Sequence, residues 1–427
     1  MRKGICTFVI IALAAATHAQ SFTARVLILN EGYFDYLTNT IITPVTVGAY
    51  DPTTGVYTTV NTIDDARFAS DIKMDGAFYY VAADHSLLKY ETATDALVDE
   101  AEVAGIRKIA ITEDQIIVTR GEYLVDLPSY VQIYNKSDLS LAYEISAAVL
   151  PHTTEGVAVA GDKAYIAVNN GFVFGAEVGY IAELDLSAEA ITSTVDLGAS
   201  GVNPDNLMQE GEFIYTLNNK DFTGSSVSAY RISTGELSTT DLVNISSGCG
   251  TSALQSGTIY YQEMFGTTLS RFDAASATIT GENDFGLSFY GLAFDPASGL
   301  MYVSETDYFS FGKVYVYNTD NSLVTSFDAG VSPGNFAFDV RTASAVENPA
   351  APELQLAPNP VISVVQVTAP FKASFAEITD ISGKLMLYEM IPAQEQVSLD
   401  VRGLASGTYI VRLRGAEGNV AALFQKQ

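Results

Sequence analysis

The sequence is poor in the residues that most often build metal and catalytic sites. Its 427 residues include no tryptophan, two cysteines and three histidines. This leaves little material for a zinc site or a disulfide framework. Basic residues are also scarce, with 22 Lys and Arg against 50 Asp and Glu and a formal net charge of −28. Phosphate backbones are bound by basic surfaces, so the composition argues against nucleic acid as a partner.

Apolar residues, in contrast, are plentiful. The chain is 48% hydrophobic, and its aromatic residues are 24 Tyr and 22 Phe. This apolar fraction is too high for a disordered acidic chain. The length favours two or three domains, although β folds often form larger single units.

Residues 1–19 have the features of a secretory signal peptide. Arg2 and Lys3 precede an apolar run that ends at Ala16, and small residues then favour cleavage before Gln20. The run is too short to span a membrane, and no later segment is apolar for 18 residues, so we expect no membrane span after cleavage. Cleavage takes the formal charge to −30 and leaves Cys249 as the only cysteine. An inert buried thiol is the expected state of Cys249, with an exposed thiol as the alternative.

A pattern of alternating apolar residues, an aromatic or large apolar residue and a polar turn recurs seven times. The spacing between copies runs from 40 to 50 residues, which fits the four-stranded blades of a β-propeller. The sequence therefore predicts an all-β fold with a seven-bladed propeller over residues 25–341. Two β-sandwiches with coincidental spacing are the alternative. The recurring position is occupied by Tyr50, Tyr90, Tyr134, Leu184, Tyr230, Phe272 and Tyr317.

The two ends of the repeat predict how the ring closes. The first copy lacks an inner strand, since Arg25 and Val26 start directly on the second strand. The last copy is followed by an extra inner strand, Asn335–Phe338. Pairing of this segment with the first copy would complete the first blade and cover its open edge.

The repeat resembles the YVTN and surface-layer family of bacterial propellers. Val47-Gly48-Ala49-Tyr50-Asp51 matches the family's strand and turn pattern, and Asn30-Glu31-Gly32 resembles the start of its exported members. The resemblance covers about residues 26–340 and implies a propeller. Some relatives bind corrinoids for uptake and others have no assigned ligand. It therefore implies a binding module, and no ligand residue is carried over.

A second domain follows a linker that is rich in Ala, Pro, Glu and Asn. We place the linker at residues 342–357 and the domain at 358–427. The domain resembles the type A C-terminal sorting domain of type IX secretion cargo. The residues that match its motifs are Asn359, Pro360, Asp380, Gly383, Lys384, Leu404, Gly407 and Tyr409.

The alternating strands of this segment predict a small immunoglobulin-like β-sandwich, and an ordinary module of that kind is the alternative to a sorting domain. The resemblance implies recognition by the outer-membrane translocon of a Gram-negative bacterium. It also implies that the protein is secreted or attached to the outer-membrane surface.

Known catalytic motifs are missing from the sequence. It has no His-Glu-x-x-His, no Gly-x-Ser-x-Gly, no phosphate-binding Gly-Lys-Ser/Thr loop and no calcium loop of the EF-hand type. His85 and His152 are isolated. We therefore predict no catalytic residue, no metal and no cofactor.

One face of the predicted propeller carries long aromatic loops, which join the second and third strands of the blades. Polar residues precede the inner strands at the same face. Aromatic side chains with a few polar groups are typical of ligand sites, and loops that only cap the ring are the alternative. The predicted ligand-binding face comprises Tyr33, Phe34, Tyr36, Arg67, Arg107, Tyr123, His152, Glu155, Phe172, Phe174, Asp205, Phe222, Phe265, Tyr290, Tyr308 and Phe309.

The leading hypothesis is a surface-exposed, non-enzymatic module that binds a small molecule, a glycan or a protein. The alternatives are a propeller lyase or hydrolase with its site at the channel mouth, and a structural or adhesive surface protein. An enzyme would need carboxylates, histidines or a metal that converge at the channel mouth.

Overall fold

The structure is a computed structural model that describes residues 21–220, 224–242, 251–263, 265–342, 354–381, 384–415 and 418–427. The predicted signal peptide, Phe222, Cys249 and Gly383 lie outside the described residues. The described residues fall into two compact units, one within residues 21–342 and one within 354–427. Each unit is all-β, and the described residues contain no helix that could cross a membrane.

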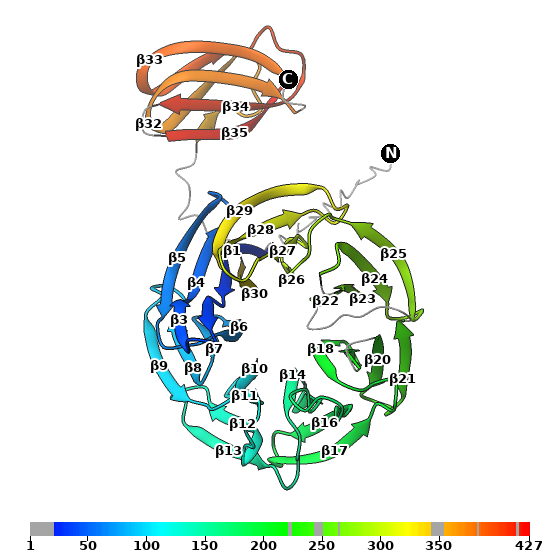
Figure 1. Ribbon diagram of the computed structural model, residues 1–427. Helices are drawn as coiled ribbons and strands as arrows, with labels where there is room; N and C mark the ends of the chain where they lie inside the picture. The colour runs from blue at the N-terminus through cyan, green and yellow to red at the C-terminus, as the bar shows by residue number, and fades with distance from the viewer. Residues whose placement is uncertain are drawn as a thin grey trace, which may run out of the picture. The chain divides into compact units, whose positions relative to one another are not determined.

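The first unit is a ring of seven four-stranded antiparallel sheets, which we number as blades one to seven along the chain (Figure 1). In each blade the innermost strand pairs with the second, the second with the third, and the third with the outermost.

The strands of blades one to four, from the inside outwards, are as follows. Blade one has β30 (Pro333–Thr342), β1 (Ser21–Asn30), β4 (Val45–Asp51) and β5 (Val56–Ile63). Blade two has β6 (Ala69–Asp75), β7 (Phe78–Ala83), β8 (Ser86–Glu91) and β9 (Leu97–Glu102). Blade three has β10 (Ile106–Ile111), β11 (Gln115–Arg120), β12 (Ser129–Asn135) and β13 (Leu141–Ser146). Blade four has β14 (Thr154–Ala160), β15 (Lys163–Val168), β16 (Tyr180–Asp185) and β17 (Ala190–Asp196).

The other three blades follow in the same order. Blade five has β18 (Pro204–Glu210), β19 (Phe213–Asn218), β20 (Ser225–Arg231) and β21 (Leu237–Leu242). Blade six has β22 (Ser252–Gln255), β23 (Thr258–Gln262), β24 (Thr268–Asp273) and β25 (Thr278–Asp284). Blade seven has β26 (Gly291–Phe294), β27 (Met301–Glu305), β28 (Phe311–Tyr317) and β29 (Leu323–Val331).

The seven recurring residues of the repeat all lie in the third strand of a blade, and all are buried. Six of them are aromatic, and their rings fill the space between neighbouring blades. Tyr50, for example, stacks on Phe327 with 4.0 Å between ring centroids, and these residues belong to blades one and seven. The sequence repeat thus arises because each blade uses the same position to pack against its neighbour.

The ring closes as the sequence predicted. Strand β30 pairs antiparallel with β1, so that Val26 lies opposite Phe338 and Ile28 opposite Phe336. The first blade therefore combines one strand from the end of the unit with three from its beginning. This pairing leaves no open edge between the first and last parts of the ring.

Two kinds of connection emerge on opposite faces of the ring. The turns between the inner and second strands are tight, and Gly76, Gly161 and Gly211 have the positive φ that such turns require. We call the other face, with the longer connections between second and third strands, the loop face. In blades three and four these connections end at Ser129 and Tyr180, where strands β12 and β16 begin.

The loop of blade one folds on itself. It forms a small hairpin of β2 (Tyr33–Asp35) and β3 (Thr40–Thr43), which the sequence pattern did not reveal. A turn at its tip is held by Asp35, whose carboxylate accepts hydrogen bonds from Leu37 and Thr38. Tyr33 and Phe34 therefore lie on an ordered element.

The second unit is a β-sandwich built from five strands, β31 (Gln355–Ala357), β32 (Val364–Asp380), β33 (Leu385–Asp400), β34 (Gly407–Gly415) and β35 (Gly418–Lys426). The first part of β32 pairs with β31 and the end of β33. Its second part pairs with the start of β33 and with β34, which in turn pairs with β35. Residues of both parts share one core, for example Val365 and Val367 with Ile378 and Val411.

The residues of the sorting motifs hold this sandwich together. The Asn359 carboxamide oxygen accepts a hydrogen bond from the Gln425 amide, which fixes the start of the domain to its last strand. Asp380 accepts a hydrogen bond from the Lys384 amide across a turn. The hydroxyl of buried Tyr409 donates to the Ala405 carbonyl, similar to the tyrosine corner of immunoglobulin-like folds.

Candidate functional site

The inner strands of four consecutive blades carry an irregularity at the same place, where each begins at the loop face. The register of β6, β10, β14 and β18 shifts within their first four residues, which is the signature of a β-bulge. The bulged segments contain Arg107 and Lys108 in blade three, Glu155 in blade four and Asp205 in blade five. A bulge changes the direction of a side chain, and here it involves charged residues at the inner edge of the ring.

Side chains of five different blades interact across the centre of the ring. Glu31 of blade one lies in the electrostatic field of Arg107 and Lys108 of blade three. Asp205 of blade five lies in the field of the same two cations. Groups from blades that are not neighbours can interact only near the axis (Figure 1). We call Glu31, Arg107, Lys108, Glu155, Asp205 and Tyr290 the axial cluster.

Arg107 and Glu155 form the strongest contact of the axial cluster. Two guanidinium nitrogens of Arg107, Nε and Nη2, donate to the two carboxylate oxygens of Glu155 at 2.8 and 3.0 Å. Glu155 is buried, and a bidentate pair of this kind is stronger than a neutral hydrogen bond. Arg107 thereby compensates the charge of Glu155 directly.

Glu31 and Asp205 have strongly altered acidities. Burial raises the pKa of the Glu31 carboxyl to about 7, although the hydrogen bond with Tyr290 and the nearby Lys108 and Arg107 act in the opposite direction. Burial also raises the pKa of Asp205 to about 6, and the negative charge of Glu155 adds to this effect. Both carboxyl groups therefore exchange protons near neutral pH.

A glycine makes room for this arrangement. A Cβ atom on Gly334, in the inner strand of blade one, would lie 2.5 Å from Oε1 of Glu31 and 3.2 Å from Cε1 of Tyr290. Both side chains thus pass directly over the backbone of Gly334. Since 2.5 Å is too short for a non-bonded contact, any larger residue would displace the Glu31 carboxyl group.

Aromatic rings surround part of the axial cluster. The Arg107 guanidinium lies over the Phe172 ring, 5.4 Å from its centroid. Tyr290 packs edge-to-face against Tyr308 at 5.3 Å. Further out, Tyr33 packs against Phe309 and Phe34 against Tyr36. Some loop rings therefore pair with each other, as the capping alternative expects, while Phe172 and Tyr290 contact charged groups.

Several other predicted site residues have different surroundings. Arg67 forms an ion pair with Asp84 and lies 3.5 Å from the Glu122 carboxylate. Tyr123, Phe174 and Phe265 are exposed, and His152 is half-buried just before β14. Of the sixteen predicted residues, the structure thus brings Arg107, Glu155, Asp205 and Tyr290 into one cluster, with Phe172 and Tyr308 against it.

Sequence reasoning missed Glu31 and Lys108. Glu31 directly follows the first strand, and Lys108 directly follows Arg107, so both lay beside residues that the pattern did single out. The alternation of a regular strand turns Arg107 and Lys108 to opposite sides. Only the bulge allows both cations to act on the same carboxyl groups.

The described residues contain no group of three or more His, Cys, Asp and Glu side chains arranged to hold a metal ion. The axial cluster offers an ion pair, hydrogen-bonding groups and carboxyl groups that titrate near neutral pH.

Solved structures share the fold of the chain at low sequence identity. A functionally unknown protein from Desulfotomaculum acetoxidans matches 74% of this chain and 99% of its own with 15% identity and a TM-score of 0.53. The extracellular domain of a B. thetaiotaomicron protein matches 96% of this chain and 59% of its own with 10% identity and a TM-score of 0.50. No curated protein sequence matches the chain. These similarities concern the fold alone.

A family model does match the C-terminal unit. Residues 355–424 match the secretion system C-terminal sorting domain, and the match begins three residues before the boundary that the sequence suggested. The difference arises because the first strand, β31, precedes Asn359 and Pro360 of the motif. The C-terminal unit is thus a sorting domain of the type IX secretion system, which directs this β-propeller to the cell surface or the medium.

Proposed function

We propose that the exported propeller is a non-enzymatic binding module whose ligand contacts the axial cluster on the loop face. The observation that carries the proposal is the convergence of charged groups from blades one, three, four and five beside the ring of Phe172. Charged groups are costly to bury and need partners, so such a concentration favours a role in recognition.

A small molecule or a single glycan unit suits this site better than a protein surface. Arg107, Lys108, Glu155 and Asp205 lie on inner strands, whereas Tyr123, Phe174 and Phe265 lie on loops and are exposed. Inner strands are rigid and fixed on both sides by neighbouring blades. Binding at such a place would require little ordering of the protein and would therefore lose little entropy.

The experiment is mass spectrometry of small molecules that co-purify with the full chain from the producing cell. We expect a bound compound with the natural protein and at least a tenfold lower amount with Asp205→Asn or Phe172→Ala. Phe265→Ala is the comparison variant, because that ring is exposed whereas the ring of Phe172 lies against Arg107. Equal amounts from all variants would contradict the proposal.

An enzyme is the second candidate, and one observation favours it. Glu31 and Asp205, with pKa values of about 7 and about 6, are suited to proton transfer at neutral pH. A lyase or hydrolase that uses them should turn over a polysaccharide from a defined panel, and its pH profile should be bell-shaped. Loss of turnover in both Glu31→Gln and Asp205→Asn would support this candidate. If no polysaccharide of the panel is turned over, the enzyme candidate is contradicted and the binding module is favoured.

A further inference from the structure

The outer face of the sorting domain carries apolar and basic side chains. The side chains of β34 alternate, so Tyr409, Val411 and Leu413 are buried while Arg412 and Arg414 face outwards. On β32, Phe375 and Glu377 lie directly opposite these two arginines. On the edge strand β33, Met390 and Tyr388 lie opposite Phe375 and Glu377 in turn.

Two rows of side chains therefore cross three adjacent strands. One row is Tyr388, Glu377 and Arg412, and the other is Met390, Phe375 and Arg414. Tyr388 is 58% exposed and Met390 is 74% exposed. The outer face of an antiparallel sheet is normally polar, so apolar residues at these positions call for a separate explanation.

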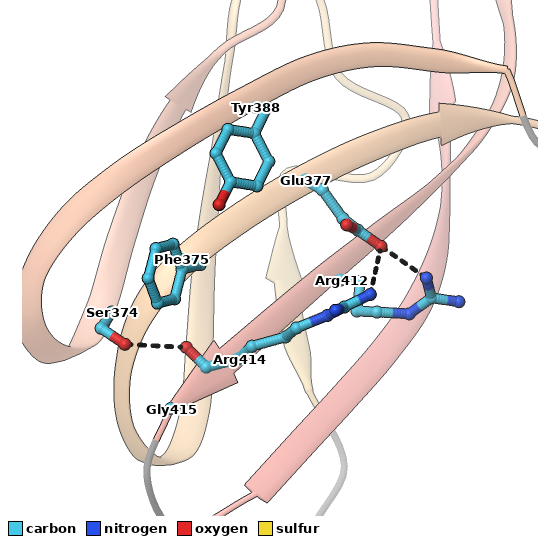
Figure 2. Close-up of a pocket in the computed structure, with 7 residues that line it drawn as sticks. All are labelled: Ser374, Phe375, Glu377, Tyr388, Arg412, Arg414 and Gly415. Atoms are coloured by element: carbon cyan, nitrogen blue, oxygen red, sulfur yellow. Dashed lines mark hydrogen bonds and ion pairs between the residues drawn. The ribbon is translucent and has the colours of Figure 1, made fainter.

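Five of these six residues, all except Met390, line a cavity of about 480 Å³ on this face, which Ser374 and Gly415 complete. Figure 2 shows both guanidinium groups turned towards the carboxylate of Glu377, with the rings of Phe375 and Tyr388 beside them. Arg412 and Arg414 donate to the same carboxylate oxygen, Oε1. The two rings stack with 6.2 Å between centroids.

The charges at this cavity do not balance. Two guanidinium groups share one carboxylate, so one positive charge is left over, and each arginine uses one of its five N–H donors on Glu377. The free donors are suited to a further carboxylate, bound beside two rings. Met, Tyr, Phe and Arg are also the residues that are enriched in the centres of protein interfaces.

Three of the motif residues have a structural role. Asn359, Asp380 and Tyr409 are engaged in hydrogen bonds that hold the sandwich together. The motifs thus maintain the shape of the domain, and its exposed faces remain available for recognition. The charge distribution agrees, because residues 354–427 contain six basic and six acidic residues, so the whole negative charge of the mature chain lies before them.

We propose that the outer face formed by Phe375, Glu377, Tyr388, Met390, Arg412 and Arg414 is the docking surface through which the export machinery binds this domain. The protein partner presents an acidic side chain, which binds the two arginines, next to an apolar side chain, which packs on the two rings. Export of the full chain then depends both on the two arginines and on the apolar side chains of this surface.

The test follows export of full-length variants in the producing organism as the fraction of protein that reaches the surface or the medium. We expect the triple variant Glu377→Gln, Arg412→Gln and Arg414→Gln, which removes the ion pairs without an orphaned charge, to be exported about tenfold less. Tyr388→Ser with Met390→Ser should have a similar effect. The matched control is Asp400→Asn with Arg402→Gln, an exposed ion pair of the same domain outside the surface.

Two further measurements separate docking from folding. Thermal unfolding of the purified triple variant should match that of the natural protein, and if it does not, the exposed pair Tyr388→Ser and Met390→Ser replaces it in the test. Export of the control variant Asp400→Asn with Arg402→Gln should equal that of the natural protein, because this ion pair lies outside the surface. Normal export of a folded triple variant, or a loss with the Asp400→Asn and Arg402→Gln control as large as that of the triple variant, would overturn the proposal.

Discussion

Arg107 and Glu155 join the inner strands of two neighbouring blades, β10 and β14, by two parallel hydrogen bonds. Both residues lie at β-bulges, which is why charged side chains meet at this position of the ring. The pair is mostly screened from water, with Glu155 more deeply buried than Arg107. Its two members depend on each other, because either one alone would be an uncompensated charge.

Arg107→Met should therefore lower the free energy of unfolding of the propeller by about 3 kcal/mol, because Glu155 then loses its cation. The double variant Arg107→Met with Glu155→Met replaces the pair by apolar groups, and we expect it to be clearly more stable than the single variant. Denaturant unfolding of the three proteins measures this difference. A double variant that is less stable than Arg107→Met would refute the coupling.

The ionisation of Glu31 should be visible in the pH dependence of the free energy of unfolding. Its pKa is about 7 in the folded protein against an ordinary value of 4.5, so folding favours the protonated form. The stabilisation is complete below about pH 4.5 and is lost as the pH rises through 7. The Glu31→Gln side chain cannot ionise. Between pH 5 and pH 8, the free energy of unfolding of this variant should therefore fall by about 2 kcal/mol less than that of the natural protein. Thermal unfolding at both pH values tests this, and identical pH slopes would contradict it.

Gly334→Ala should disturb the same carboxyl group without changing its charge. The added methyl group would lie 2.5 Å from Oε1 of Glu31, so the side chain or the strand must move. We expect a loss of about 1 to 3 kcal/mol in unfolding free energy. Gly281→Ala is the control, since its Cβ would meet no atom closer than 3.9 Å. Equal stability of the two variants would show that the axial cluster tolerates the displacement.

The sequence was sufficient for the architecture, because each blade repeats one buried position and one tight turn. Tyr50 and Tyr230 occupy equivalent places for the same packing reason, and the extra strand at Asn335 had only one open edge to pair with. Local patterns of this kind can be predicted from a single chain. Arg107, Glu155 and Asp205 were recognised as polar residues before inner strands.

Their convergence with Glu31 could not be predicted in the same way. Glu31 and Lys108 are separated by more than a full blade along the chain, and they interact across the ring centre. Bulges, which have no simple sequence signature, decide which side chains turn inwards. The altered pKa values depend on burial, which arises only when all seven blades are in place.

Tyr409→Phe tests whether the sorting motif acts through the fold. The substitution removes the hydroxyl that donates to the Ala405 carbonyl at 3.0 Å and keeps the ring that stacks on Phe424. We expect the sorting domain to lose about 1 kcal/mol, measured by limited proteolysis of the full chain. Tyr388→Phe should leave stability unchanged because that side chain is exposed. If export of Tyr409→Phe falls only in proportion to the unfolded fraction, the motif tyrosine supports the domain and does not contact the exporter. A complete loss of export from a stably folded Tyr409→Phe protein would instead place the exporter at the motif itself.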